Sequence, residues 1–160
     1  MLRVCLICVG KLKERFYQEA CDEYVKRLAP YCKLTIVELP EEKLPQAPSQ
    51  AQIDAALAKE ATAIRGRIPP SARVVALCVE GRLRSSEEMA RMFPDLAYSR
   101  EKCLVFLIGG SYGLDETLKS EAQVRLSMSP MTFPHHLARV MLLEQLYRGF
   151  QINEGGKYHK

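Results

Sequence analysis

The sequence predicts an α/β fold with a mostly parallel sheet, and three observations support this. Strand-like and helix-like segments alternate along the chain, which is the order that builds a parallel sheet with helices on both faces. The strand-like runs Leu2–Val9 and Val74–Val79 are almost continuously apolar, as in strands buried on both faces. The chain has 160 residues, so we expect a single domain over residues 1–160.

Each expected element has a local signal. The strands share apolar runs bounded by Gly, Pro or polar residues, and in chain order they are Leu2–Val9, Leu34–Leu39, Val74–Val79, Cys103–Ile108 and Val124–Met128. The helices show helical spacing or a cap, and they cover Glu14–Leu28, about Gln50–Arg65, a segment through Met92 and Leu96, a short segment after Asp115, and a long segment from Pro134. Ser49 with Gln52, and Ser85 with Glu88, have the spacing of a capping box.

The composition is that of an ordinary globular protein, with 48% apolar and 26% charged residues and a net charge of +4. No run approaches the roughly 20 apolar residues of a membrane helix. The N-terminal segment lacks the small-residue cleavage site of a signal peptide, so we expect a cytoplasmic protein with no membrane contact. The modest positive charge permits an anionic partner such as RNA but does not require one.

Six cysteines fit the cytoplasm as free thiols. Cys5 and Cys8 form a C-x-x-C pattern, which raises the alternative of a redox or zinc site. Residues three apart on a strand point to opposite faces, and no second pair of this kind supplies further metal ligands. We therefore expect both residues to be buried and structural, and we expect no metal.

The last helix carries apolar residues around most of its circumference, namely Leu137, Val140, Met141, Leu142, Leu143, Leu146, Tyr147 and Phe150. A helix that is apolar on more than one side is packed on more than one side. One small sheet covers only one side, which favours a homodimer in which this helix meets a second copy. Packing entirely within one chain is the alternative.

Three loops follow strands at the edge where an open parallel sheet binds ligands: Val79–Gly81, Gly109–Gly113 and Met128–Phe133. The glycine loop lacks the glycine at position 108 that a G-x-G-x-x-G dinucleotide motif needs, and it lacks the P-loop lysine. Its glycines could serve only to turn the chain. Met128–Phe133 offers apolar side chains, backbone polar groups and a proline bend, which fit either an adenine site or an apolar connector.

The polar residues near the C-terminus also have two interpretations. His135 and His136 point about 100° apart on a helix, so they cannot share a metal as an i, i+4 pair would. Glu144 and Arg148 lie at i, i+4 spacing and are expected to pair. The tail Gly155–Lys160 combines a glycine turn with aromatic, imidazole and cationic groups that suit an RNA base and its phosphates, although chain ends are also commonly frayed.

Several motifs together resemble those of the RlmH-type SPOUT methyltransferases. They are spread over the whole chain: Val9–Glu14, Glu23–Leu28, Ile108–Leu114, Met131–His135, Arg139–Arg148 and Tyr158–Lys160. Members of this family methylate N3 of a pseudouridine in helix 69 of 23S ribosomal RNA. The resemblance implies an α/β fold with a C-terminal trefoil knot, an exception to unknotted chains, and a homodimer that acts on the 70S ribosome.

The resemblance also implies a cofactor and site residues. S-adenosyl-L-methionine (S-adenosylmethionine) is expected to contact Leu77, Gly109, Met128, Ser129, Pro130, Met131, Thr132 and Phe133. The tail of one subunit is expected to approach the cofactor pocket of the other. Arg148, Tyr158 and His159 are the candidates for positioning the base or handling its N3 proton, with His135 behind them. Cys78 and Glu80, beside Leu77, are assigned no role.

Two other functions remain open from the sequence. An α/β dehydrogenase would use the same strand ends, but the missing first glycine counts against it. A non-catalytic ribosome-binding factor could keep the fold and lose the chemistry, but the intact cofactor-loop residues argue against it.

Overall fold

The computed structural model describes residues 1–97, 100 and 102–160. Its centre is a five-stranded sheet in the order β2-β1-β4-β3-β5, and every pairing between its strands is parallel. The strands are β1 (Leu2–Val9), β2 (Cys32–Leu39), β3 (Arg73–Leu83), β4 (Cys103–Ile108) and β5 (Val124–Ser127). The helices are α1 (Arg15–Leu28), α2 (Gln50–Arg65), α3 (Ser86–Ala90), α4 (Met92–Ala97), α5 (Glu116–Glu121) and α6 (His135–Asn153). The expected parallel sheet is confirmed, whereas the trefoil knot stays a prediction.

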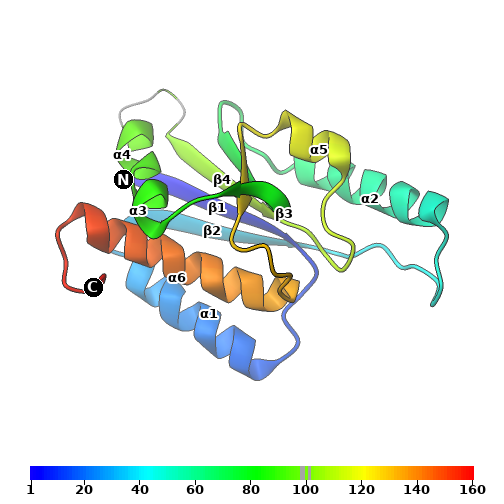
Figure 1. Ribbon diagram of the computed structural model, residues 1–160, viewed down its shortest axis with the longest axis horizontal. Coiled ribbons are helices and arrows are strands. Elements are labelled where there is room, and N and C mark those ends of the chain that lie inside the picture. The colour runs from blue at the N-terminus through cyan, green and yellow to red at the C-terminus, as the bar shows by residue number, and fades with distance from the viewer. Residues whose placement is uncertain (98–99, 101) are drawn as a thin grey trace.

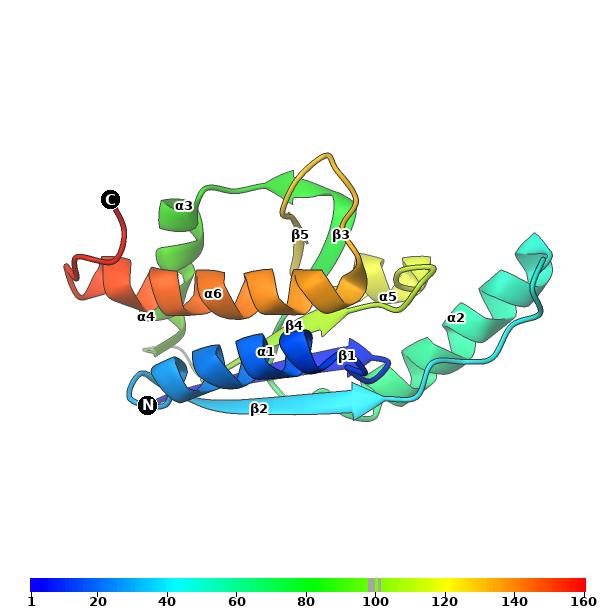
Figure 2. The same ribbon diagram turned by 90° about the horizontal axis from the view of Figure 1, so that it is seen from below.

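Helices cover both faces of the sheet, as predicted (Figures 1 and 2). On one face α1, α3, α4 and α6 enclose a core that contains Phe106 and Leu146. On the other face α2 and α5 enclose a second core that contains Ile64 and Leu107. Successive residues of β4 enter the two cores in turn, which is why that strand is apolar throughout.

The expected caps begin their helices where predicted. Ser49 Oγ accepts a hydrogen bond from the Gln52 backbone N–H at 3.2 Å, and Gln52 Oε1 accepts one from the Ser49 N–H at 2.9 Å. Ser85 and Glu88 form the same reciprocal pair at the start of α3. Asp115 caps α5. Each cap satisfies backbone donors that the first helical turn leaves free, which fixes the first residue of the helix.

The third strand differs from its prediction. β3 does not end at Val79 but continues to Leu83, and residues on both sides of a bulge pair with Leu126 of β5. Gly81 lets β3 come back into contact with β5 after the bulge. Any other residue would place a Cβ 2.8 Å from the backbone of β5, which is too close. The apolar pattern stops at the bulge, so it could not show that pairing resumes beyond it.

Two helix boundaries also differ. The segment through Met92 and Leu96 is two short helices, α3 and α4, separated at Arg91. Pro134 is the N-cap of α6 rather than its first helical residue. Proline suits either position, because it has no N–H that needs a partner there.

Cys5 and Cys8 lie in opposite cores, as expected, and all six cysteines are free. Burial raises the pKa of the Cys8 thiol to about 12, so this residue does not present a thiolate. Within residues 1–97, 100 and 102–160, no group of three or more His, Cys, Asp or Glu side chains is arranged to hold a metal ion. In the same part of the chain, none of the helices has the length and apolar character needed to cross a bilayer.

The last helix is covered on more than one side within the chain. α6 packs against α1 and α3 and touches β4, and Leu142, Leu143 and Leu146 are fully buried. From His135 to Ile152 no residue is exposed. The alternative of packing within one chain therefore accounts for much of the apolar pattern of this helix. The homodimer stays a prediction.

Candidate functional site

A cavity of about 560 Å³ opens beyond the carboxyl ends of β3, β4 and β5. This is the edge at which open parallel sheets bind ligands, and the volume is that of a small-molecule site. Of the eight residues expected to contact a cofactor, seven line the cavity: Leu77, Gly109, Met128, Ser129, Met131, Thr132 and Phe133. Pro130 is not among the lining residues.

The glycine loop after β4 is closed on itself and leaves no room for a side chain at Gly109. A Cβ at Gly109 would lie 2.3 Å from the backbone of Gly113, which has a φ of +78°. The Gly113 N–H donates to the Gly110 carbonyl at 3.0 Å, which closes the turn. Glu41 Oε1 accepts from the Ser111 N–H at 2.8 Å and so ties the turn to the loop after β2. The backbone of this turn therefore forms a fixed wall of the cavity.

The loop between β5 and α6 is shaped by its own serines. Ser127 Oγ donates to the Ser129 carbonyl at 3.0 Å, and Ser129 Oγ accepts from the Met131 N–H at 3.0 Å. Met128 and Phe133 give the cavity apolar and aromatic surface. Met131, although it lines the cavity, is 72% exposed. Its side chain is thus an apolar group on the molecular surface at this site.

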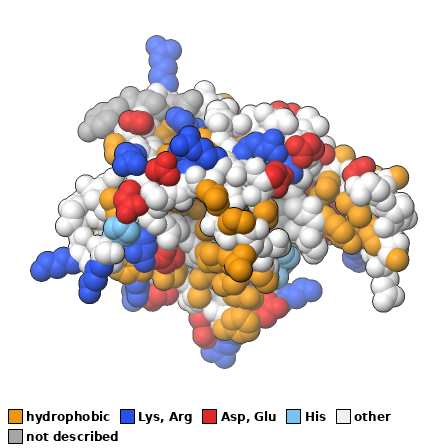
Figure 3. Space-filling model, viewed as in Figure 1, with side chains coloured by type: hydrophobic (Ala, Val, Ile, Leu, Met, Phe, Trp, Pro, Cys, Tyr) orange, Lys and Arg blue, Asp and Glu red, His pale blue; other side chains and the backbone are white. Residues whose placement is uncertain are grey.

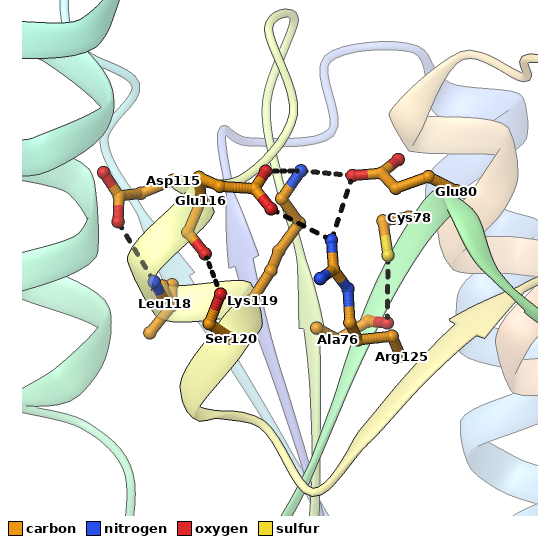
Figure 4. Close-up of polar contacts among 9 residues, drawn as sticks. All are labelled: Ala76, Cys78, Glu80, Asp115, Glu116, Leu118, Lys119, Ser120 and Arg125. Carbon is orange, nitrogen blue, oxygen red and sulfur yellow. Dashed lines mark hydrogen bonds and ion pairs between the residues drawn. The ribbon is translucent and has the colours of Figure 1, made fainter.

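Four charged side chains form one network at the cavity wall (Figure 4). Lys119 pairs with Glu80 and, at 2.9 Å, with Glu116, while Arg125 lies 3.2 Å from Glu116. The bond from Lys119 lowers the pKa of Glu80, so this carboxyl group stays ionised. Burial opposes the charge of Lys119, but its bonds to the two carboxylates outweigh burial and raise its pKa.

Several polar residues that line the cavity were given no role from the sequence, among them Cys78, Glu80 and Lys119. The i, i+3 spacing of Glu116 and Lys119 could have indicated a pair on a short helix. Glu80, however, is 39 residues from Lys119. No signal in the sequence links these two residues, because their contact depends on the order of the strands.

The three candidate catalytic residues, Arg148, Tyr158 and His159, come together at the far end of α6. Arg148 donates to Glu144 Oε1 at 2.5 and 2.9 Å, which confirms the expected i, i+4 pair. The Tyr158 hydroxyl donates to the same oxygen at 3.1 Å, and the Arg148 guanidinium lies 4.7 Å from the centre of the Tyr158 ring. The tail is therefore docked on α6 rather than frayed.

His159 is held from two sides. Its Nε2 lies 2.7 Å from Glu87 Oε1, and its Nδ1 lies 3.3 Å from Arg148 Nη1. A carboxylate only accepts and a guanidinium only donates, so these partners favour a neutral ring with the proton on Nε2. Burial, together with Tyr24 and Glu144, raises the pKa of Tyr158 to about 12, so the phenol stays protonated.

His135 occupies a different place from the other three candidates. It lines the cavity, and burial and the neighbouring His136 lower its pKa, which keeps the imidazole neutral near pH 7. Arg148 is thirteen residues further along the same helix. At the helical rise per residue this places it about 20 Å away. One chain therefore presents two separate parts of a site, the cavity and the docked tail.

The chain is similar to known proteins of the same length. It is 43% identical over 159 residues to "Ribosomal RNA large subunit methyltransferase H" of Clostridioides difficile (strain 630). The match covers 99% of this chain and all of that protein. It is 44% identical over 160 residues to the protein of the same name from Moorella thermoacetica, with both chains covered completely.

A solved structure shares the fold. The probable methylase family protein from Haemophilus influenzae Rd KW20 aligns with a TM-score of 0.55 at 12% identity, over 95% of this chain and 66% of that one. The profile described as "Predicted SPOUT methyltransferase" matches residues 2–159. With relatives this similar over the full length, and with the cavity at the strand ends, the chain belongs to the SPOUT methyltransferase family.

Proposed function

We propose that this protein transfers a methyl group from S-adenosylmethionine to N3 of a pseudouridine in helix 69 of 23S ribosomal RNA, on the assembled 70S ribosome. The proposal is carried by the cavity beyond β3, β4 and β5, in a chain that matches large-subunit ribosomal RNA methyltransferases over its whole length. A ribosomal substrate places the protein in the cytoplasm.

The cavity fits this cofactor in size, shape and charge. Its volume of about 560 Å³ suits a nucleoside with a side chain, and Gly109 keeps one wall free of side chains. Met128 and Phe133 can pack on a purine. Among the described residues that line the cavity, Glu80 is the only one with a carboxylate, which can face the cationic groups of the cofactor. When bound, S-adenosylmethionine supplies an electrophilic methyl group on a sulfonium sulfur.

The residues of the chain must orient the base and remove the proton from N3. Arg148, whose pKa is raised by Glu144, and Tyr158, with its pKa of about 12, remain protonated and act as donors that position the base. His159 is the one of the three that can accept a proton. To do so it must release Arg148, which occupies Nδ1, the ring nitrogen without a proton. His135, neutral and at the cavity, is the second candidate.

A homodimer completes the site in this proposal. The cavity and the docked tail lie about 20 Å apart along α6, so a two-fold axis across this helix would bring the tail of one copy to the cavity of the other. Phe16 and Met131 are 63% and 72% exposed. Figure 3 shows apolar side chains gathered on one face, over the region where α6 and α1 begin. An exposed apolar patch of this kind is typical of an interface.

The modest net charge of +4 favours the ribosome over free RNA as the substrate. A protein that neutralises few phosphates binds free RNA weakly, and its affinity falls steeply with salt. An assembled ribosome can add contacts that a free strand does not provide.

Methyl transfer to ribosomes tests the proposal. We expect methyl-labelled S-adenosylmethionine to label the 23S RNA of 70S ribosomes that lack the modification, and free 23S RNA to be labelled far less. Reverse transcription should then stop in helix 69, because a methyl group on N3 blocks Watson–Crick pairing. Calorimetry with NAD in place of S-adenosylmethionine excludes a dehydrogenase if NAD gives no heat. Cofactor binding without any transfer would instead indicate a non-catalytic ribosome-binding factor.

A further inference from the structure

A second cavity, of about 260 Å³, lies beside α3 and differs in character from the first. Its lining residues are Arg73, Arg84, Glu88, Arg91, Met92 and Asp95. Five of these six side chains are charged, whereas the first cavity is lined mainly by apolar residues and glycines. A wall of this kind suits a small charged group.

The arginines of this cavity lack the carboxylate partners that several arginines elsewhere in the chain have. Arg65, Arg139 and Arg148 each bind a carboxylate. Among the described residues, no carboxylate forms an ion pair with Arg73, Arg84 or Arg91.

Two of the three arginines also have an unpaired buried donor. The Nε atoms of Arg73 and Arg84 are buried and have no hydrogen-bond partner. A buried unpaired donor costs about 1–3 kcal/mol, and a bound acceptor relieves that cost.

The charge balance of the cavity favours an anion. Glu88 is already engaged, because its Oε2 accepts from the Ser85 N–H at 2.8 Å and its Oε1 lies 3.5 Å from Arg82. With Arg82 included, four arginines stand against the two carboxylates Glu88 and Asp95, which leaves a surplus of two positive charges. The planar guanidinium fork matches the oxygens of a phosphate group.

The cavity lies next to the docked tail. Glu87 of α3 binds His159, and the following residue, Glu88, lines the cavity. Figure 3 shows Lys and Arg side chains on the same face as the apolar patch, over the segment that joins β3 to α3 in Figure 1. A nucleotide held by the tail would therefore have neighbouring phosphates within reach of these arginines.

We propose that Arg73, Arg84 and Arg91 form a site for a phosphate of the substrate RNA backbone, which fixes the strand that carries the target base. This inference rests on the proposed function, because it takes ribosomal RNA as the substrate. It adds a phosphate-binding site outside the cofactor cavity, with a role in affinity and register and none in the transfer step.

Salt-dependent RNA binding tests the site without cofactor or turnover. The affinity for a labelled helix 69 stem–loop is measured by fluorescence anisotropy over a potassium chloride series for the wild type, Arg84→Gln and Arg91→Gln. Losing one phosphate contact should make the slope of log affinity against log salt shallower by about 0.7–0.9. Affinity at low salt should fall several-fold, while affinity for S-adenosylmethionine stays unchanged and the melting temperature does not fall, because Arg84→Gln also removes a buried unpaired donor. Arg84→Lys should keep the slope but bind more weakly, because it keeps the charge and loses the fork.

Arg67→Gln is the matched control, because Arg67 is an exposed arginine that follows α2 on the opposite face of the sheet. It loses the same charge and should keep the wild-type slope. Slopes of Arg84→Gln and Arg91→Gln equal to that of Arg67→Gln would overturn the site, even if methylation is normal. If Arg84→Gln and Arg91→Gln have shallower slopes than Arg67→Gln but the wild type does not methylate ribosomes, the phosphate site is supported and the proposed function is contradicted. Stabilisation by inorganic phosphate that Arg84→Gln abolishes, with an unchanged RNA slope, would identify free phosphate as the ligand and overturn the RNA assignment.

Discussion

Lys119 of α5 and Glu80 of β3 form an ion pair that joins two elements across the cavity wall. The side chain of Lys119 is 11% exposed, whereas that of Glu80 is 49% exposed. Glu80 lies in the stretch where β3 bulges away from β5 between Leu77 and Arg82. The pair therefore anchors this irregular stretch to α5 on one side of the cofactor cavity.

Replacing Lys119 tests this anchor. We expect Lys119→Met to destabilise the fold by only about 1 kcal/mol, since its partners Glu80 and Glu116 are exposed and screened by water. Binding of S-adenosylmethionine should weaken several-fold, because Glu80 and the bulge lose their support. Glu116→Gln is the matched control, since Glu116 also binds Lys119 but does not line the cavity. Equal losses of cofactor affinity in both variants, measured by calorimetry, would contradict the assignment.

Gly109 should not tolerate any side chain. In Gly109→Ala the new Cβ would lie 2.3 Å from the backbone of Gly113, so the glycine turn must move. We expect affinity for S-adenosylmethionine to fall at least about tenfold, a free-energy loss of about 1.4 kcal/mol. Gly66→Ala, where the nearest atom is 3.6 Å away and φ is −64°, should bind normally. Normal binding by both variants would exclude the turn from the cofactor site.

Removing residues 158–160 should separate cofactor binding from methyl transfer. The tail lies about 20 Å from the cavity of its own chain, so its loss leaves the cofactor loops intact. We expect methylation of 70S ribosomes to be abolished while calorimetry shows nearly unchanged affinity for S-adenosylmethionine. Removal of Lys160 alone is the control and should keep most of the activity. Wild-type turnover by the longer deletion would remove Tyr158 and His159 from the mechanism.

Alkaline pH should destabilise the fold through Cys8. Burial raises the pKa of this thiol from 9.0 to about 12, so above pH 9 the unfolded chain loses a proton that the folded chain keeps. Stability is therefore full below pH 9 and falls as the pH rises towards 12, by up to about 1.4 kcal/mol per pH unit for one thiol. Urea unfolding at pH 8 and pH 10.5 measures the loss. Cys8→Ala should show a smaller loss, although Cys32, whose pKa is raised to about 11, leaves part of it. An identical pH dependence would show that Cys8 is not the cause.

Short-range features of this protein could be predicted from the sequence alone. The capping pairs Ser49–Gln52 and Ser85–Glu88 and the pair Glu144–Arg148 join residues three or four positions apart, so helical geometry brings them together. Continuous apolar runs indicated strands between two layers of helices, because a strand buried on both faces cannot carry alternating polar residues. The positions of three loops after strands indicated a ligand site, and the resemblance added S-adenosylmethionine as its ligand.

Only the tertiary structure decided which distant residues meet. Lys119 and Glu80 are 39 residues apart, and His159 and Glu87 are 72 apart. Their contacts depend on the sheet order β2-β1-β4-β3-β5 and on the bulge in β3, neither of which leaves a periodic signal. The sequence thus determined the elements and their caps, because those depend on neighbours within one helical turn. The fold decided the charged cavity wall, the docked tail and the arginine cavity, because each depends on how the elements pack.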